Sequence, residues 1–404
     1  MGKERGLINH KDKFQNEVIS LRDQLVDDLV RKGYIRSKTI EDAFRKVPRH
    51  LFLPKTELQE AYTDGSIITK RVGIEPISSS TAPSLMASML ELLSLKQGMK
   101  VLEIGTGTGY NVALLAELVG DEQKVFSVDI DAEIIKEAQQ NLAETGYNNI
   151  TIECADGAKG LPEYSPYDRI IVTASARNIP RLLVEQLKEE GIIVLPIWIN
   201  GTQITPALKK QKDGNLIGLS TTIGGFMELR SKTYPEMLTD FSKQNLEGEL
   251  LICSEHPELF EEARLRSLFN RPHKEKPLPP EGILPPRGSN FFIFLALHER
   301  KSVELFLEED IDKFGFGESA AGIVDLENNS GCLISKDNKV LVYGESSAYE
   351  RFLSLMEKWE SLKRPGVERL QVFAYMRNRV PKLERDDLLL KEKSPPLVIR
   401  ILDF

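Results

Sequence analysis

"VLEIGTGTGY" (residues 101–110) joins a short apolar run to three glycines at alternate positions, Gly105, Gly107 and Gly109. The run is rich in Val, Leu and Ile, which suits a buried strand. Glycine lets the backbone turn sharply and lets a ligand approach the main chain closely. We therefore expect a strand over residues 100–105, a ligand-binding turn, and a helix over residues 109–119.

Short strand-like runs and amphipathic helices alternate on both sides of this loop. The predicted strands cover residues 100–105, 125–130, 150–154, 168–174 and 192–197. The predicted helices cover residues 82–95, 109–119, 132–145 and 179–188. Such alternation predicts an α/β fold with a doubly wound, mainly parallel sheet of Rossmann-like type.

The residues of the glycine loop can be compared with three known kinds of ligand-binding loop. A dinucleotide loop has the pattern G-x-G-x-x-G, but Tyr110 stands where the third glycine would be. A P-loop needs a lysine after its last glycine, and none follows here. An acidic residue two positions before G-x-G-x-G, here Glu103, is instead what S-adenosylmethionine methyltransferases show. This ligand is cationic and has no phosphate, so a carboxylate suits it.

Two further carboxylates follow the next predicted strands. Asp129 ends the second strand, where it can accept both ribose hydroxyls, and Asp156 with Gly157 follows the third, where the adenine should lie. The carboxyl ends of parallel strands meet at one edge of a sheet, where such folds bind ligands. Each residue alone could merely mark a turn, and Tyr110 either covers the cofactor or belongs to the core. The expected cofactor set is Glu103, Gly105, Thr106, Gly107, Gly109, Tyr110, Asp129, Ile130, Asp156 and Gly157.

Four hydroxyl side chains, Ser78, Ser79, Ser80 and Thr81, precede the helix predicted at residues 82–95. One hydroxyl is enough to cap a helix. A hydroxyl can also orient a carboxylate by donating a neutral hydrogen bond, without the strong hold of an arginine salt bridge. For Ser78 and Ser79 both interpretations stay open.

The ends of the chain lack the alternating pattern. Residues 1–80 are expected to hold a helix at 14–33, a second from about residue 37 or 39 to residue 47, and then a loop-rich entry segment. The alternation makes residues 81–230 the central domain. Residues 231–404 are expected to form a second, α+β domain that can pack on the first and serve for peptide recognition or as a lid. Within that domain we expect a Pro-rich linker at 270–290, strands at 291–298 and 340–346, and a helix at 347–363.

The bulk composition narrows the class of protein. The chain has 404 residues and a net charge of −8, so we expect about two soluble domains that bind no nucleic acid. No apolar run approaches the ~18 residues of a membrane span, and the N-terminus lacks a signal-peptide pattern. Three separated cysteines and five histidines argue against a metal site and predict a cytoplasmic location.

Several ordered motifs resemble the protein-L-isoaspartate O-methyltransferase family over about residues 14–215. They are "VPRHLFLP" (47–54), "AYTDG" (61–65), "TAPSLMASMLELL" (81–93), the glycine loop, and "ADGAKGLPEYSPYDRIIVTA" (155–174). The resemblance implies an enzyme that transfers a methyl group from S-adenosyl-L-methionine to a carboxylate of a protein or peptide bearing isoaspartate or aspartate. It also makes Thr81 the residue nearest that carboxylate, with Ser80 and Ser79 as helpers. Arg49 can pair with a substrate carboxylate or anchor its loop to Asp64, and we favour the anchor.

The chain departs from the family pattern in two places. "IITKRVGIEPISSSTAP" (67–83) replaces the usual G-x-G-Q-T-I-S lead-in, and some 170 residues follow the predicted sheet. These features resemble a branch associated with ribosomal peptide maturation, in which the methyl ester of an Asp closes to aspartimide. Two alternatives therefore stay open: a dedicated Asp methyltransferase of that kind, and a non-catalytic peptide-binding methyltransferase fold. The oligomeric state is left undetermined.

Overall fold

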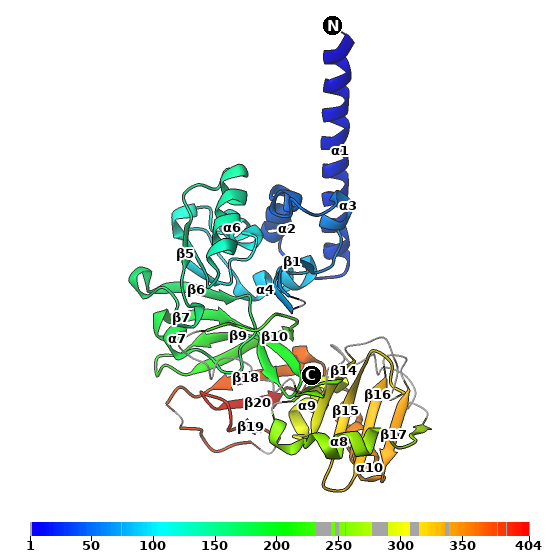
Figure 1. The fold of residues 1–404 in the computed structure, drawn as a ribbon. Coiled ribbons are helices and arrows are strands. Elements are labelled where there is room, and N and C mark those ends of the chain that lie inside the picture. The colour runs from blue at the N-terminus through cyan, green and yellow to red at the C-terminus, as the bar shows by residue number, and fades with distance from the viewer. Residues whose placement is uncertain are drawn as a thin grey trace.

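Figure 1 shows the computed structural model of the chain, which describes residues 2–73, 75–231, 244–246, 250–254, 256–276, 290–307, 315–335, 339–377, 379–384 and 386–403. The N-terminal helices lie at one end of the molecule, a large sheet lies in the middle, and a second sheet lies beside it. Within these ranges, no helix combines the length and the apolar character needed to cross a membrane.

The parallel half of the large sheet confirms the predicted α/β fold. Its strands are β3 (Val101–Ile104), β4 (Val125–Asp129), β5 (Thr151–Cys154), β6 (Tyr167–Val172) and β7 (Leu187–Val194). They lie in the order β5-β4-β3-β6-β7, and each pair is parallel. The accompanying helices are α4 (Pro83–Leu93), α5 (Tyr110–Val119), α6 (Ala132–Glu144) and α7 (Arg181–Gln186).

Alternate residues of these strands face two different cores, as expected for a sheet covered on both faces. Val101 and Ile171 pack with α4, α5 and the N-terminal helices, whereas Leu102 and Ile170 pack with α7 on the opposite face. Short 3-10 turns complete the connections: η2 (Glu122–Lys124), η3 (Gly157–Lys159) and η4 (Pro162–Tyr164).

The other half of the large sheet is antiparallel. It continues from β7 through β9 (Thr202–Lys210) and β10 (Leu216–Ile223), with β8 (Ile197–Ile199) beside β9. The last strands of the chain then extend it: β18 (Leu370–Ala374), β20 (Leu397–Ile401) and β19 (Leu388–Leu390). The large sheet is therefore mixed, with a parallel, doubly wound half and an antiparallel half.

A second, antiparallel sheet lies beside the first (Figure 1). Its order is β11 (Gln244–Leu246), β12 (Leu250–Cys253), β14 (Ser302–Leu307), β15 (Ser319–Asp325), β16 (Ser330–Ser335), β17 (Val340–Gly344) and β13 (Lys274–Lys276). The nearby helices and turns are α8 (Glu262–Phe269), α10 (Ser347–Ser361), η6 (Pro257–Leu259) and η7 (Val367–Arg369). Residues 231–404 thus do not form one separate unit, because their last strands belong to the large sheet.

The segment 291–298 is a helix, α9 (Asn290–His298), and the prediction of a strand there was wrong. Every residue from Phe291 to Leu297 is buried. Ile293 and Leu297 pack on the large sheet, while Phe292 and Leu295 pack on the second. A helix buried on all sides carries no polar stripe, so its apolar run cannot be told from a buried strand by periodicity. The predicted strand at 340–346 and helix at 347–363 correspond to β17 and α10, and most of the predicted linker lies outside the described residues.

The N-terminal segment contains the two predicted helices, α1 (Gly2–Arg31) and α2 (Lys38–Lys46), of which α1 begins earlier than expected. A 3-10 turn η1 (Arg49–Phe52) and a short helix α3 (Leu58–Ala61) follow. The entry segment then forms a hairpin, β1 (Ile67–Val72) and β2 (Glu75–Ser80), where the sequence suggested loops. This hairpin places the hydroxyl residues near the carboxyl ends of the parallel strands β3, β4 and β6.

Candidate active site

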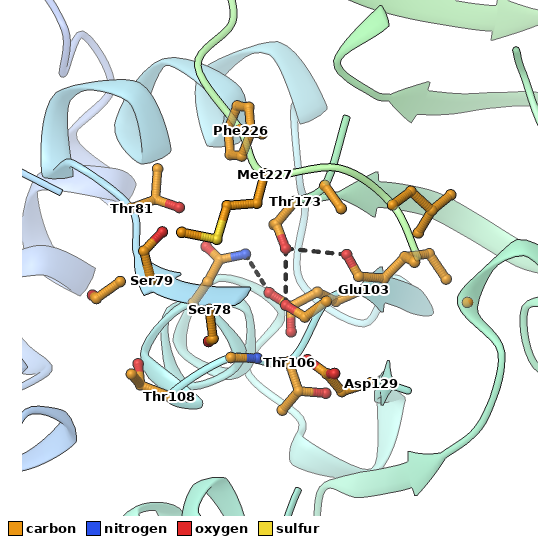
Figure 2. Close-up of a pocket in the computed structure, with 18 of the residues that line it drawn as sticks. Ser78, Ser79, Thr81, Glu103, Thr106, Thr108, Asp129, Thr173, Phe226 and Met227 are labelled. Carbon is orange, nitrogen blue, oxygen red and sulfur yellow. Dashed lines mark hydrogen bonds between the residues drawn. The ribbon is translucent and has the colours of Figure 1, made fainter. Parts of the chain in front are cut away.

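A cleft with about 870 Å³ of space, part of it open to solvent, lies at the carboxyl ends of β3, β4 and β6. The hydroxyl run of β2 lies on one side, the glycine loop and Asp129 on the other, and Phe226 and Met227 above (Figure 2). The predicted residues that line it are Ser79, Ser80, Thr81, Glu103, Gly105, Thr106, Gly107, Tyr110, Asp129, Ile130 and Gly157.

The floor of the cleft requires glycine. Gly105 has a φ of +101°, and a Cβ added there would lie 2.5 Å from Thr173 Oγ1. Thr173 is itself fixed, because its hydroxyl lies 3.0 Å from the Ile104 carbonyl and 2.8 Å from the Gly105 carbonyl. A Cβ on Gly157 would lie 2.4 Å from Ile104 Cγ2. The loop therefore exposes bare backbone to a ligand.

Glu103 lies beneath this loop and is fully buried. Asn111 donates to one carboxylate oxygen at 2.7 Å and Ser127 to the other at 2.6 Å. Burial raises the pKa of Glu103 to about 8, against the lowering effect of these two donors. Both oxygens of Glu103 are thus bound from within the fold, and Glu103 lines the cleft floor. The expectation that it meets a cationic ligand stays a prediction.

Asp129 lies at the rim of the same floor. Its carboxylate oxygens accept hydrogen bonds from the backbone N–H of Gly107 and of Asp131, each at 3.2 Å. Burial raises the pKa of Asp129, and the nearby Arg230 opposes this rise. Each oxygen keeps a further lone pair with which to accept a hydroxyl.

Two predicted residues shape the site without lining it. Gly109 begins α5 with a φ of +86°, and a Cβ there would face Leu142 of α6 at 3.2 Å. Asp156 accepts from the Ala158 N–H at 3.1 Å and from the Ser231 hydroxyl at 2.8 Å. Asp156 therefore ties the end of β5 to the segment that follows β10.

The hydroxyl run does not cap α4. Asp64 accepts from the Ser84 N–H at 2.9 Å, and the Ser66 hydroxyl accepts from the Ala82 N–H at 3.2 Å. Ser78 is used within the hairpin, where it accepts from the Thr69 hydroxyl at 3.0 Å. With the cap supplied from residues 64–66, Ser79, Ser80 and Thr81 are available to the cleft (Figure 2).

Arg49 is fully buried directly behind this run. Its Nη2 donates to the Thr81 carbonyl at 3.2 Å and lies 3.4 Å from Ser80 Oγ, and further bonds reach the carbonyls of Thr63 and Gly65. Its expected pairing with Asp64 is replaced by these bonds, because Asp64 caps α4. Burial lowers the pKa of Arg49, yet an arginine keeps its charge in proteins.

Part of the cleft was not predicted from the sequence. The upper wall consists of residues 225–230, and Thr108 and Asn111 add to the lining. The wall segment follows β10, where the regular alternation has already ended. Its glycine pair, Gly224 and Gly225, is the sequence signal that could have marked it as a turn against the sheet.

The fold and the cleft together define the class. Doubly wound sheets bind ligands at the carboxyl ends of their strands, and this cleft offers carboxylates and bare backbone. The protein is an S-adenosylmethionine-dependent methyltransferase. The model of the family "Protein-L-isoaspartate(D-aspartate) O-methyltransferase (PCMT)" matches residues 20–233. The chain belongs to this family and is a carboxyl O-methyltransferase.

Similar proteins agree on this family. A protein-L-isoaspartate O-methyltransferase of Ignicoccus hospitalis is 40% identical over 198 residues, which are 48% of this chain and 90% of that one. One of Methanococcoides burtonii is 44% identical over 177 residues, or 43% and 83% of the two chains. A solved structure of a protein-L-isoaspartate O-methyltransferase is 27% identical with a TM-score of 0.50, and the match covers 87% of this chain and 96% of that one.

The cleft residues fit S-adenosylmethionine. Gly105 and Gly107 line the cleft, and a glycine lets a ligand approach the backbone closely. Glu103 lies below the loop, where a cationic ligand would favour the ionised form of its carboxyl group. Asp129 has acceptor capacity for ribose hydroxyls.

Proposed function

We propose that this enzyme methylates the free carboxylate of isoaspartyl residues in proteins and peptides, and that Thr81, Ser80 and Ser79 orient that carboxylate. The observation that carries the assignment is that this hydroxyl run lines the cleft while Asp64 and Ser66 cap α4 in its place.

The contacts of Arg49 support the same roles. Because the Ser80 oxygen accepts from Arg49, its own O–H is free to donate toward the cleft. The Arg49 charge raises the electrostatic potential behind Ser80 and Thr81, while Arg49 itself does not line the cleft. A carboxylate in front of them is thus attracted without a direct salt bridge that would weaken it as a nucleophile.

The reaction requires little proton transfer by the residues of the chain. A side-chain carboxylate is ionised near neutral pH, so no general base is required. The bound cofactor supplies a methyl group on a sulfonium. The chain's own residues hold the two reactants in line and exclude water, with Phe226 and Met227 covering the cleft opposite Asp129 (Figure 2).

The long C-terminal part does not call for a dedicated peptide-maturation role. The solved structure that covers 87% of this chain carries the ordinary family name. We therefore favour isoaspartyl substrates over a single precursor peptide.

The test is methylation of an isoaspartyl peptide and of the matched Asp peptide with labelled S-adenosylmethionine. We expect a base-labile methyl ester on the isoaspartyl peptide alone. Thr81→Val keeps the shape of the side chain but removes the donor, so kcat/KM should fall about 10- to 100-fold, as for a hydrogen bond to a charged group. Thr151→Val, at the start of edge strand β5, is the control and should leave kcat/KM unchanged. Exclusive methylation of the Asp peptide would refute the assignment.

A further inference from the structure

The upper wall of the cleft, residues 225–230, lies outside the named strands. Two residues that lie beside it, Ser175 and Gln203, hold it in place. Ser175 donates its N–H to the Met227 carbonyl at 2.8 Å and accepts from the Leu229 N–H at 2.8 Å. Gln203 bonds both polar groups of the Phe226 backbone, accepting from its N–H and donating to its carbonyl, each at 2.9 Å. These contacts set where Phe226 and Met227 lie above the cleft.

The positions of Ser175 and Gln203 both depend on the hairpin formed by β8 and β9. Gln203 belongs to β9. Trp198 of β8 donates its indole N–H to the Ser175 hydroxyl at 2.7 Å, and its backbone N–H to the Ala176 carbonyl at 3.1 Å. A shift of this hairpin would therefore move the wall through both Ser175 and Gln203.

The same hairpin is held by the C-terminal part of the chain. Lys393, which is only 2% exposed, donates to the Trp198 carbonyl at 2.6 Å. At the hairpin tip, Asn200 donates to the Ala296 carbonyl of α9 at 2.9 Å, and the Ser302 hydroxyl lies 3.3 Å from the Asn200 carbonyl. A buried ammonium is costly unless it is well bonded, so Lys393 is a rigid support.

The end of the wall nearest Asp129 has a separate anchor. Ser231 is bonded to Asp156, at the end of β5. The hairpin thus controls mainly the end near Phe226 and Met227, which lies toward Thr81 (Figure 2).

We infer that the C-terminal part of the chain positions the substrate-facing wall of the active site through the β8–β9 hairpin, and that Lys393 is a positioning residue for peptide binding. The inference rests on the proposed function for the identity of the substrate, an isoaspartyl peptide. Residues far beyond the family match therefore take part in peptide selection by the central cleft.

The test is Lys393→Met in the full chain. We expect the KM for the isoaspartyl peptide to rise about tenfold, the equivalent of about 1.4 kcal/mol, while the KM for S-adenosylmethionine changes less than twofold. Amide hydrogen exchange of residues 224–231 should speed up. Lys210→Met is the matched control. Lys210 lies at the far end of β9 from residues 202–204, which pair with β8, and it also donates to backbone carbonyls, those of Val184 and Leu187 at 2.6 Å. This variant should change neither quantity.

A second pair guards against a misfolded lysine variant. Trp198→Phe removes the indole donor and should reproduce both effects, whereas Trp359→Phe, which loses a similar bond to the Pro365 carbonyl, should not. Unchanged exchange of residues 224–231 in both Lys393→Met and Trp198→Phe would overturn the inference, as would faster exchange with an unchanged peptide KM. A wild-type enzyme that ignores isoaspartyl peptides would instead refute the proposed function, and the exchange measurement would still decide whether Lys393 supports the wall.

Discussion

Glu103 has a carboxyl group that the fold forces into the protein interior. Its pKa is about 8 in the folded protein against an ordinary value of 4.5. Between these pH values the unfolded chain has released a proton that the folded protein keeps. The contribution of Glu103 to folding stability therefore falls as the pH rises from about 4.5 to about 8.

Glu103→Gln should remove this pH dependence, because Gln cannot ionise. In cofactor-free protein, we expect the difference in melting temperature, variant minus wild type, to increase by several degrees from pH 5 to pH 8. Calorimetric scans at the two pH values measure this gain. Glu189→Gln, an exposed site, should show none, and an equal difference at both pH values for Glu103→Gln would contradict the expectation.

Gly105→Ala should be damaging for two separable reasons. The positive φ costs about 1–3 kcal/mol for a non-glycine residue, and the new Cβ would meet the Thr173 hydroxyl. Gly146 also has a positive φ, +91°, but nothing lies within 4 Å of its added Cβ. Denaturant unfolding should thus show a larger loss for Gly105→Ala than for Gly146→Ala.

The contact with Thr173 can be removed on its own. Adding Thr173→Ala to Gly105→Ala should recover part of the lost stability and of the cofactor affinity measured by calorimetry. If the two glycine variants lose the same stability, the close approach to Thr173 is not what requires a glycine.

Residues fixed by spacing could be predicted, and residues fixed by distant contacts could not. Gly105, Gly107 and Asp129 stand at regular distances from strand ends, so the sequence alone indicated them. The bonds of Arg49 go mostly to backbone carbonyls, which leave no mark in the sequence. The same holds for the wall at Phe226 and Met227, whose place over the cleft depends on Gln203 and Ser175.

At the scale of elements, the hairpin β1–β2 and helix α4 show how a cap can come from elsewhere in the chain. The predicted helix boundaries at 82–95 were close, but the serines before it suggested the wrong cap. Asp64, some twenty residues earlier, accepts from the Ser84 N–H. The same sequence pattern, hydroxyls before a helix, therefore lines the cleft here and does not cap the helix.

Asp64→Ala should destabilise the protein by about 1 kcal/mol, as for the loss of a helix cap. We also expect kcat/KM on an isoaspartyl peptide to fall, because α4 begins two residues after Thr81. Asp64→Asn keeps an oxygen that can accept the Ser84 N–H and should stay close to the wild type in urea unfolding. A comparable loss in both variants would assign the effect to the charge of Asp64 near Arg49.

Helix α9 shows where pattern reading fails at this scale. Its seven buried residues, Phe291 to Leu297, face two sheets at once. The choice between strand and helix required the knowledge that two sheets pack against this segment. The local sequence does not contain that information.

At the scale of the whole molecule, the division at residue 230 suggested by the fading alternation does not separate two independent units. Strand β10 pairs with β18 from the end of the chain, and the Thr221 hydroxyl donates to the Leu370 carbonyl at 2.7 Å. The parallel half could be predicted because its alternation is local. The antiparallel half could not, since β10 and β18 are far apart in the sequence.

A chain that ends at residue 231 should therefore aggregate. It would expose the unpaired edge of β10 and the apolar residues that α9 and β18 cover, and exposed edges promote association. Size-exclusion chromatography of the fragment against the full chain tests this. A monodisperse fragment that unfolds cooperatively would show that residues 231–404 are dispensable for the large sheet.

The pairing of β10 with β18, and of β18 with β20, also has a consequence for synthesis. Chains generally begin to fold from the N-terminus while they are being made, and the glycine loop and its parallel strands are then among the first parts to emerge. Strands β18 and β20 and Lys393 lie more than 160 residues after the parallel strands and emerge well after them. A nascent chain on the ribosome would thus hold the glycine loop and its parallel strands well before β18 and β20 are available to extend the sheet.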